Sequence, residues 1–382
     1  MRIAIVINKS WNIFNFRMSL VKALLRAGHE VIAIAPEDAY SAKLVEAGCR
    51  FVPLEMESKG TNPLKDLLLI NRFRKVYRQV KPDAILQYTI KPNIYGTIAA
   101  KLAGIPTINN VSGLGTVFIV ENLVSKIAHA LYRFSFQYPA KVFFQNSDDQ
   151  ALFLDRKLVR ASITEVIPGS GIDTQRFQPA AQFKRQKPFV FLMVSRALYE
   201  KGLVEYVEAS KILKRQYPDL RIQLLGAIDE EGNIGIKRTL VEQWAQEGWL
   251  EYLGTSDDVA SVIHQADCVV LPSYREGTPR TLLEAAAMGK PIVTTNVPGC
   301  KETVVDGYNG YLCEVRNGTD LAAKMAQILE LTEEELETMG RHSRRLAEDK
   351  FDEKYVIDRY FAAIEAATGQ VARKIEPNLS YS

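Results

Sequence analysis

Short runs of aliphatic and β-branched residues alternate with amphipathic stretches along almost the whole chain. In the first half, the runs that predict strands are residues 2–7, 30–35, 51–54, 84–88, 106–110 and 141–145. Between them lie stretches such as residues 16–28, in which apolar positions recur every three or four residues, as on one face of a helix, up to a stop at Gly28. This alternation predicts an α/β fold with a parallel, doubly wound sheet built from βαβ units.

The alternation starts again after residues 178–188, a polar stretch with two prolines that we interpret as an interdomain linker. The strands predicted beyond it are residues 189–195, 221–226, 251–254, 268–273, 291–296 and 310–313, and the helices are 318–330, 333–349 and 353–367. We therefore expect a Rossmann-like domain over 1–178, a second one over 188–350, and a C-terminal helix over 351–369 that packs back on the first domain.

Length and composition agree with this organisation and exclude several classes of protein. The 382 residues exceed the size at which a single hydrophobic core keeps growing, and a net charge of +3 is too small to indicate nucleic-acid binding. The four cysteines are far apart and form no Cys-x-x-Cys pair, so neither a zinc site nor a disulfide framework is predicted. No apolar run reaches the roughly 20 residues that span a bilayer, and we expect a cytoplasmic protein.

Two glutamates, Glu276 and Glu284, lie in the stretch REGTPRTLLEAAAMGKP, residues 275–291. Thr278 and Pro279 are typical of an N-cap and a first helical position, so we expect Glu276 in a loop and Glu284 in the helix that follows. The two carboxylates of a glycosidase lie roughly 5 to 10 Å apart, whereas eight helical residues span roughly 12 Å. The spacing therefore argues against a glycosidase pair.

The start of this predicted helix favours an anionic ligand. Backbone N–H groups between Gly277 and Arg280 lie where a helix offers them no carbonyl partner, an arrangement that binds phosphates. Glu276 beside them suits the hydroxyls of a sugar, and Glu284 suits a more distant pair of hydroxyls. From spacing alone, the alternative is that both glutamates are ordinary surface charges.

Five segments of the chain resemble, in order, those of the retaining GT-B glycosyltransferases of the GT4 family. They are IPGSGIDTQRF (167–177), VSRALYEKG (194–202), YLGTSDDV (252–259), EGTPRTLLEAAAMGKPIV (276–293) and VPGCKETVVDGYNGYL (297–312). The fourth contains the Glu-x7-Glu motif of that family. The resemblance covers nearly the whole chain and implies the GT-B fold, in which two Rossmann-like doubly wound domains face a cleft, the first for the acceptor and the second for a nucleotide-sugar donor.

The resemblance also implies roles for particular residues. Arg196 and Lys201 would hold the diphosphate of the donor and form the catalytic set with Glu276, which would position the transferred sugar. Glu284 would bind the ribose. The other donor contacts expected are Gly226, Gly254, Thr255, Gly277, Thr278, Pro279 and Arg280. Arginine and lysine suit a departing diphosphate, and the chain has no Asp-x-Asp motif, so we expect that neither a metal ion nor another cofactor is required.

The N-terminal half departs from the family pattern in its first loop, where NKSWNIFNFR (8–17) lacks the usual Gly-Gly pair. Residues 12–18 and 88–96 resemble a subgroup of bacterial polysaccharide and glycan-assembly transferases that includes an N-acetylgalactosaminyltransferase. That resemblance implies transfer of a UDP-linked N-acetylhexosamine to a polyprenyl-diphosphate-linked saccharide in cell-surface glycan assembly. The candidate acceptor contacts are Asn8, Lys9, Arg17, Lys91, Asn93, Ser112 and Gly113.

Residues 64–82 and 125–141 combine apolar and basic side chains in helical patterns. Such helices suit peripheral contact with the anionic inner face of the plasma membrane, which would bring the protein to a lipid-linked acceptor. The alternative is that each is an ordinary helix that packs one face on a sheet.

Other functions also fit two Rossmann-like domains. A sugar-nucleotide epimerase of the same fold needs no acceptor, and a transferase with a soluble acceptor needs no lipid. A nucleotide-dependent oxidoreductase is disfavoured because no Gly-x-Gly-x-x-Gly motif occurs. A non-catalytic binding module is disfavoured because the donor motifs are all filled.

Overall fold

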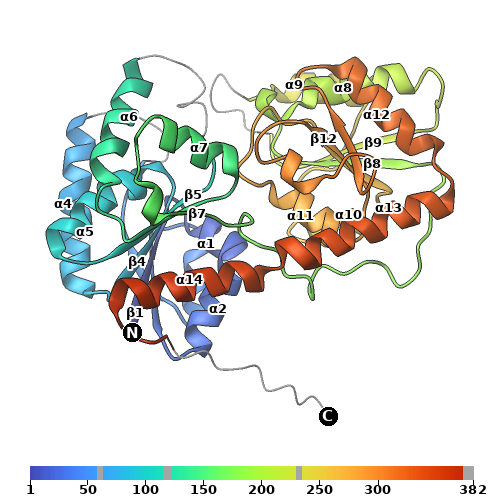
Figure 1. Cartoon of the computed structure of the whole chain (residues 1–382). Coiled ribbons are helices and arrows are strands. Elements are labelled where there is room, and N and C mark those ends of the chain that lie inside the picture. Colours follow the sequence, from blue (N-terminus) through green and yellow to red (C-terminus); the bar gives the residue numbers. More distant parts are fainter. Residues whose placement is uncertain (58–62, 115–122, 229–234, 373–382) are drawn as a thin grey trace, which may run out of the picture. The chain divides into compact units, whose positions relative to one another are not determined.

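The computed structural model describes residues 1–57, 63–114, 123–228 and 235–372, which belong to two compact units (Figure 1). Unit 1 consists of Met1–Ser170 and Lys354–Ser382, and unit 2 of Gly171–Glu353.

The boundary between the units precedes the expected linker, residues 178–188, which belongs entirely to unit 2. The segment just before it is held by distant residues of the same unit. The backbone N–H of Ile172 donates to the Phe351 carbonyl (2.8 Å), and the Thr174 hydroxyl donates to Asp352 (2.6 Å). Because these partners lie almost 180 positions further along the chain, local composition carries no sign of the true boundary.

In the described residues of unit 1, seven parallel strands form a sheet in the order β3-β2-β1-β4-β5-β6-β7. Their bounds are β1 Arg2–Val6, β2 Glu30–Ala35, β3 Arg50–Pro53, β4 Ala84–Tyr88, β5 Thr107–Val111, β6 Lys141–Phe144 and β7 Thr164–Val166. The first six lie where the apolar runs predict them. The seventh was missed because it is a three-residue edge strand with no buried residue, so it lacks an apolar run.

Helices cover both faces of this sheet, as double winding requires (Figure 1). One face packs on α1 (Ser10–Phe16), α2 (Met18–Arg26), α3 (Ser41–Glu46) and α14 (Glu353–Thr368), and the other on α4 (Pro63–Val80), α5 (Thr97–Ala103), α6 (Leu123–Ser135) and α7 (Ser147–Asp155). Successive residues of β1 alternate between the two cores: Ile3 and Ile5 enter the first, and Ala4 and Val6 the second. The final helix contributes Val356, Tyr360, Phe361 and Ile364 to the first core.

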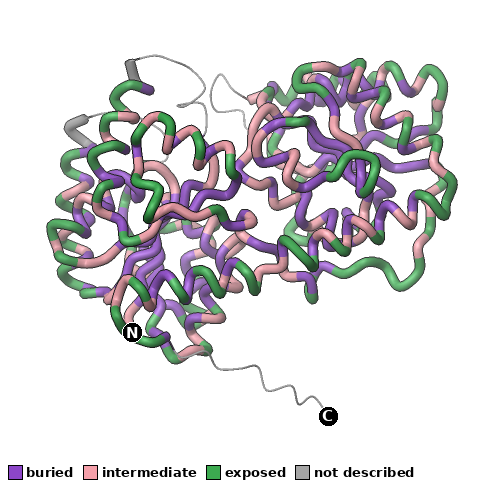
Figure 2. The backbone as a smooth tube through the Cα atoms, in the orientation of Figure 1, coloured by how far each residue is buried: buried purple, intermediate pink, exposed green. Residues whose placement is uncertain are grey.

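The part of unit 2 that the structure describes has a sheet of six parallel strands in the order β10-β9-β8-β11-β12-β13. They are β8 Val190–Val194, β9 Arg221–Leu225, β10 Glu251–Tyr252, β11 Cys268–Leu271, β12 Ile292–Thr295 and β13 Gly310–Cys313. The helices are α8 Leu203–Leu213, α9 Arg238–Gln246, α10 Val259–His264, α11 Arg280–Ala287, α12 Gly318–Glu330 and α13 Glu333–Leu346. Figure 2 shows the strands of both sheets buried beneath these layers.

The order of strands reverses direction at one point in each sheet. In unit 1 this switch point lies between β1 and β4, and in unit 2 between β8 and β11, each pair being hydrogen-bonded and parallel. The connections that leave the carboxyl ends of the two strands run to opposite sides there, which is why ligands of open α/β sheets bind at such points. The fold therefore directs attention to the loops after β1, β4, β8 and β11.

Candidate functional site

The loops after β8 and β11 bring together Lys201 and Glu276, two of the three residues expected to be catalytic. The Lys201 ammonium donates to Glu276 Oε1 in an ion pair, and the side chains are 20% and 14% exposed. Both loops leave the carboxyl edge of the unit 2 sheet at its switch point. A cation and a carboxylate thus meet where the topology favours a ligand.

A buried serine that the sequence analysis missed supports this pair. The Ser273 hydroxyl, which is fully buried, lies 2.7 Å from Glu276 Oε1 and 3.1 Å from the Glu200 carbonyl oxygen. The next residue, Tyr274, donates its backbone N–H to the same carbonyl (2.8 Å). These bonds fasten the two loops to each other. The signal available in the sequence was the position of Ser273 at the end of the predicted strand 268–273.

Two glycines allow the loops to approach so closely. Gly202 has φ +75°, and a Cβ built on it would lie 2.1 Å from the Pro272 carbonyl oxygen. Gly299 has φ +87°, and its Cβ would lie 2.3 Å from the carbonyl oxygen of Glu276. Only glycine fits at either position, because any side chain would meet backbone atoms and adopt a strained φ.

The helix α11 begins one residue later than predicted. Its N-cap is Pro279, with no side-chain cap, and Arg280 is the first helical residue. The Thr278 hydroxyl donates to the Gly277 carbonyl (3.0 Å). The first hydrogen bond of the helix runs from Leu282 N–H to the Pro279 carbonyl (3.0 Å), so the backbone N–H groups that precede it belong to the start of α11.

Within α11, Arg280 and Glu284 form a largely buried ion pair. Arg280 Nε lies 3.0 Å from Glu284 Oε1, and the two side chains are 16% and 13% exposed. Burial raises the pKa of the Glu284 carboxyl, and the Arg280 guanidinium acts in the opposite direction. Glu284 is therefore not an ordinary surface charge, and Arg280 acts on its ionisation.

The other expected donor residues lie along the same edge. Gly226 follows β9 with φ +151°, and a Cβ there would lie 1.9 Å from the Ser195 carbonyl oxygen. Its N–H donates to the Gly254 carbonyl (2.7 Å), so these two candidates are in contact. Arg196 lies two residues beyond the end of β8 and is exposed, as is Thr255.

In unit 1 the candidate acceptor residues do not form a single group. Lys91 pairs with the buried Asp66 (3.1 Å), which also accepts a hydrogen bond from the Tyr95 hydroxyl (2.8 Å). Lys9 is exposed at the N-cap of α1, and Asn8 accepts a hydrogen bond from Asn12 (3.2 Å). The structure thus holds the charge of Lys91 in an internal ion pair.

Three other candidates lie near the carboxyl ends of β4 and β5. Asn93, in a π-helical turn at Pro92–Gly96, donates to the Asn110 carbonyl (2.9 Å) and is 1% exposed. The Ser112 hydroxyl donates to Asn110 Oδ1 (2.8 Å), and Gly113 follows with φ +128°.

Arg17 occupies the break between α1 and α2, which the sequence had placed inside one helical stretch. It is 8% exposed, its Nη1 donates to the Phe16 carbonyl (2.8 Å), and its guanidinium carbon lies 4.5 Å from the centre of the Tyr88 ring. Tyr88 is the last residue of β4, so this contact also lies at a switch point.

Comparison with known proteins identifies the family. The profile described as "Glycosyl transferases group 1" matches residues 174–346, and the profile "Glycosyl transferase 4-like" matches residues 2–146. The chain is 31% identical over 378 residues to the N,N'-diacetylbacillosaminyl-diphospho-undecaprenol alpha-1,3-N-acetylgalactosaminyltransferase of Campylobacter jejuni, covering 94% of this chain and 97% of that protein. This chain belongs to the group 1, GT4-like glycosyltransferases.

Further comparisons agree with this family assignment. The chain is 26% identical over 298 residues to the UDP-Gal:alpha-D-GlcNAc-diphosphoundecaprenol alpha-1,3-galactosyltransferase of Escherichia coli, covering 74% of this chain and 73% of that protein. The crystal structure of Anabaena HepE in complex with UDP and glucose has the same fold, with a TM-score of 0.76 and 19% identity. The match covers 95% of this chain and 98% of that chain. The expected α/β GT-B fold of two Rossmann-like domains and the expected glycosyltransferase activity are confirmed.

The described part of the transferase contains neither a candidate metal site nor a membrane-spanning helix. No group of three or more His, Cys, Asp or Glu side chains there is arranged to hold a metal ion. Among the same residues, no helix is both long and apolar enough to cross a membrane.

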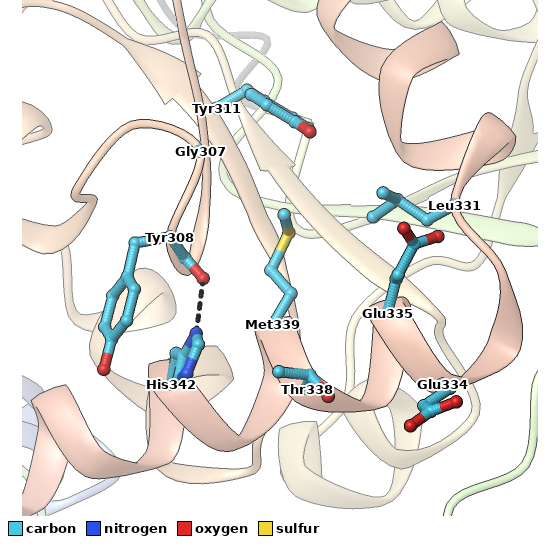
Figure 3. Close-up of a pocket in the computed structure, with 9 residues that line it drawn as sticks. All are labelled: Gly307, Tyr308, Tyr311, Leu331, Glu334, Glu335, Thr338, Met339 and His342. Carbon is cyan, nitrogen blue, oxygen red and sulfur yellow. Dashed lines mark hydrogen bonds between the residues drawn. The ribbon is translucent and has the colours of Figure 1, made fainter.

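A pocket of the transferase with a volume of about 330 Å³ lies elsewhere in unit 2 (Figure 3). Its lining includes the stacked rings of Tyr308 and His342, whose Nδ1 bonds to the Tyr308 carbonyl (2.9 Å). The rest of the lining is Gly307, Tyr311, Leu331, Glu334, Glu335, Thr338 and Met339. With two carboxylates and neither lysine nor arginine, this lining does not suit a diphosphate.

Proposed function

We propose that this transferase moves an N-acetylhexosamine from a UDP-linked donor to a polyprenyl-diphosphate-linked saccharide, with retention of the anomeric configuration, in cell-surface glycan assembly. The observation that carries the proposal is the Lys201–Glu276 pair beside the start of α11 at the unit 2 switch point. It provides a cation for a phosphate and a carboxylate for sugar hydroxyls on adjoining loops.

The donor diphosphate would exchange partners with this pair. A phosphate oxygen offers Lys201 a stronger charge than a single carboxylate does, and the carboxylate released by Lys201 would accept hydrogen bonds from the sugar. Arg196 and the first N–H groups of α11 would share the phosphate charge, with Gly226, Gly254 and Thr255 along the same edge. Glu284, held by Arg280, would accept from the ribose hydroxyls.

The proposed transfer step builds negative charge on the departing phosphate. The bond between the anomeric carbon and the β-phosphate oxygen breaks, and the acceptor hydroxyl oxygen bonds to that carbon on the same face. The acceptor proton passes to the departing phosphate oxygen, so the reaction needs no protein base. Lys201 and Arg196 stabilise the charge that builds on the phosphate, and Glu276 orients the sugar.

The choice of donor and acceptor rests on the relatives. The Campylobacter jejuni protein carries N-acetylgalactosaminyl transfer and diphospho-undecaprenol in its name, and the Escherichia coli protein carries UDP-Gal and diphosphoundecaprenol. UDP and UDP-glucose occupy crystals of HepE. Asn8, Lys9, Arg17, Lys91, Asn93, Ser112 and Gly113 are the proposed acceptor residues of unit 1.

Peripheral contact with the cytoplasmic membrane surface is part of the proposal. On α4, Leu69, Phe73 and Tyr77 face the core, whereas Leu67 and Leu68 are 65% and 58% exposed. The neighbouring exposed cations are Arg72, Lys75 and Arg78. On α6, Ile127 and Phe134 are both 51% exposed. Exposed apolar residues beside cations suit an anionic bilayer surface.

An assay of product formation tests the proposal. The protein is incubated with UDP-N-acetylgalactosamine, UDP-N-acetylglucosamine, UDP-galactose or UDP-glucose and a prenyl-diphosphate-linked saccharide, and the product is analysed by mass spectrometry and NMR. We expect an α-linked product from one N-acetylhexosamine donor, lost in Glu276→Ala and Arg196→Ala, and unchanged turnover in a chelator.

The same assay distinguishes the alternatives. An epimerised sugar released without acceptor would indicate an epimerase, and transfer only to a free saccharide would indicate a soluble acceptor. Normal turnover after Glu276→Ala would overturn the site, and turnover abolished by a chelator and restored by Mg²⁺ would overturn the metal-independent mechanism.

A further inference from the structure

The guanidinium of Arg17 is a buried cation with little around it to compensate its charge. Besides the bond from Nη1 to the Phe16 carbonyl (2.8 Å) and the contact with the Tyr88 ring (4.5 Å), its Nε is buried and has no hydrogen-bond partner. No ion pair of the described residues includes Arg17. The residue is only 8% exposed, so water supplies little of the missing solvation.

The groups next to Arg17 are neutral. Tyr88 is fully buried and its hydroxyl interacts with Arg17 and with Tyr360, whose ring, from the last helix, lies 6.2 Å from that of Tyr88. The Tyr360 hydroxyl accepts a hydrogen bond from Asn110 Nδ2 (3.0 Å). Burial raises the pKa of Tyr88 and, well above its ordinary value, that of Tyr360, so neither phenol ionises at physiological pH.

An arginine held in this way is costly to the fold. Removing a cation from water without a counter-ion costs several kcal/mol, and a ring face recovers only part of this. Buried unpartnered donors are rare in native proteins and need an explanation. Here Arg17 Nε is such a donor, on a side chain in contact with Tyr88 at the switch point of the unit 1 sheet.

We infer that Arg17 and Tyr88 form an anion-binding site of unit 1 that takes a phosphate group, with Tyr360 as a positioning residue behind Tyr88. The guanidinium supplies the charge and Nε–H, and the Tyr88 hydroxyl supplies a second donor. Identifying this phosphate as part of the acceptor's diphosphate rests on the proposed function. Lys91 is a poorer candidate for the same role, because Asp66 already neutralises it.

Calorimetric titration of the full-length protein tests the site. Saturating UDP is present throughout, so that the phosphate-binding residues of unit 2 are occupied. The probes are inorganic pyrophosphate and a short-chain prenyl diphosphate. We expect Arg17→Met to weaken binding of both by about tenfold or more, as loss of a charge-assisted contact does. Tyr88→Phe, which keeps the ring, should weaken binding by about threefold to tenfold.

The matched control is Lys22→Met, which removes an exposed cation from α2 and should leave both affinities unchanged. A melting curve separates function from folding. Replacing an uncompensated buried cation by methionine should leave the melting temperature unchanged or raise it. A purely structural arginine would instead lower the melting temperature on substitution and leave pyrophosphate binding intact, and that result would overturn the inference.

The two probes distinguish the source of the phosphate. Tighter binding of the prenyl diphosphate, lost with pyrophosphate binding in Arg17→Met, indicates the lipid-linked acceptor, and equal binding of the two indicates a site for free phosphate. Unchanged affinities in both Arg17→Met and Tyr88→Phe would overturn the site. Cleavage of UDP-sugar is measured separately, so failure of the proposed reaction and failure of the anion site give different results.

Discussion

The two units share a strand order and a switch point but treat their cations differently. In unit 2, Lys201 is paired with Glu276 and Arg280 with Glu284. In unit 1, Arg17 lies on a tyrosine ring, and the polar groups around it are neutral phenols and amides. The same topology therefore gives one edge where a ligand must displace a carboxylate and another where it meets an uncompensated cation.

This difference has consequences for binding. In the proposed donor site, the Glu276 carboxylate next to Lys201 would compete with phosphate. It would thereby weaken diphosphate binding and, once released, contact the sugar. Arg17 has no such competitor, so its free energy of desolvation is recovered only when an anion binds. Removing a carboxylate from one edge and a cation from the other should therefore have opposite effects on the affinity for phosphates.

The largest effect is expected from Glu276→Gln. Without the carboxylate, the sugar loses a partner, and kcat should fall by about 10²-fold to 10³-fold, as for other groups that orient or stabilise the transition state. Lys201 is released at the same time, so UDP should bind several-fold more tightly than to the wild type. Steady-state kinetics and calorimetry measure the two effects.

Lys201→Met serves as the counterpart and should lower both kcat and the affinity for UDP. Arg215→Met, which removes an exposed cation after α8, should change neither. Weaker binding of UDP to Glu276→Gln would contradict the idea that the carboxylate competes with the diphosphate.

The next largest effect is expected where the backbone at Gly299 contacts the loop that carries Glu276. Gly299→Ala would place a Cβ 2.3 Å from the Glu276 carbonyl oxygen, so the loop that carries Glu276 must move. We expect a loss of stability of at least a few kcal/mol, seen as a lower midpoint in chemical unfolding, together with loss of transfer activity.

Gly104→Ala in unit 1 is the matched control. It has a similar φ, +71°, but a Cβ added there would have no atom within 4 Å, so it reports the cost of the backbone conformation alone, about 1–2 kcal/mol. Equal losses in the two variants would show that the close approach at Gly299 is unimportant.

A smaller, pH-dependent effect is expected at the second ion pair. Burial raises the pKa of Glu284 above the ordinary 4.5, so this carboxyl takes up a proton at a higher pH than an exposed one. If Glu284 binds the donor in its ionised form, the donor KM should rise as the pH is lowered. Arg280→Met removes the guanidinium that opposes the raised pKa, so the rise should begin at a higher pH.

Measurement of the donor KM from neutral to acidic pH at constant ionic strength checks this. A further rise in the pKa of Glu284 lowers its ionised fraction at a given acidic pH, so the donor KM of Arg280→Met should exceed that of the wild type there. Glu284→Gln should have a high KM without this dependence on pH. Superimposable profiles for the wild type and Arg280→Met would count against the role of Arg280.

The smallest effect is expected from Tyr360→Phe. The ring is kept, but Asn110 Nδ2 loses its acceptor, a change worth about 1 kcal/mol. We expect the KM for the lipid-linked acceptor to rise by up to about fivefold while the KM for the donor stays the same. A rise in the KM values for both donor and acceptor, or in neither, would contradict a role of Tyr360 in acceptor binding.

Much of the fold was predictable because each central strand is a short apolar run. Twelve predicted strands appear in the structure, since strands buried on both faces contain few polar residues. The missed strand β7 lies at the edge of its sheet, where burial no longer selects apolar residues. The break at Arg17 was missed because α1 and α2 have continuous helical periodicity, and no glycine or proline marks their junction.

The candidate site was predictable to a different degree in the two units. In unit 2, the order of motifs pointed to Lys201, Glu276 and Glu284, and the spacing of four residues between Arg280 and Glu284 was a usable sign of an ion pair. Ser273 was missed because a serine after a strand is common. In unit 1, Lys91 and Arg17 carried equal weight as phosphate contacts, although Asp66 neutralises only one of them.

By itself, the sequence determined the two Rossmann-like sheets, the loops that carry the chemistry and the family, because all three depend on residues close together in the chain. Tertiary structure alone decided which charges are compensated by residues far away in the sequence. Lys201 meets Glu276 across 75 positions, and Tyr360 meets Asn110 across 250. Such encounters depend on strand order and helix packing, so no local pattern distinguishes a paired cation from one that is held for a ligand.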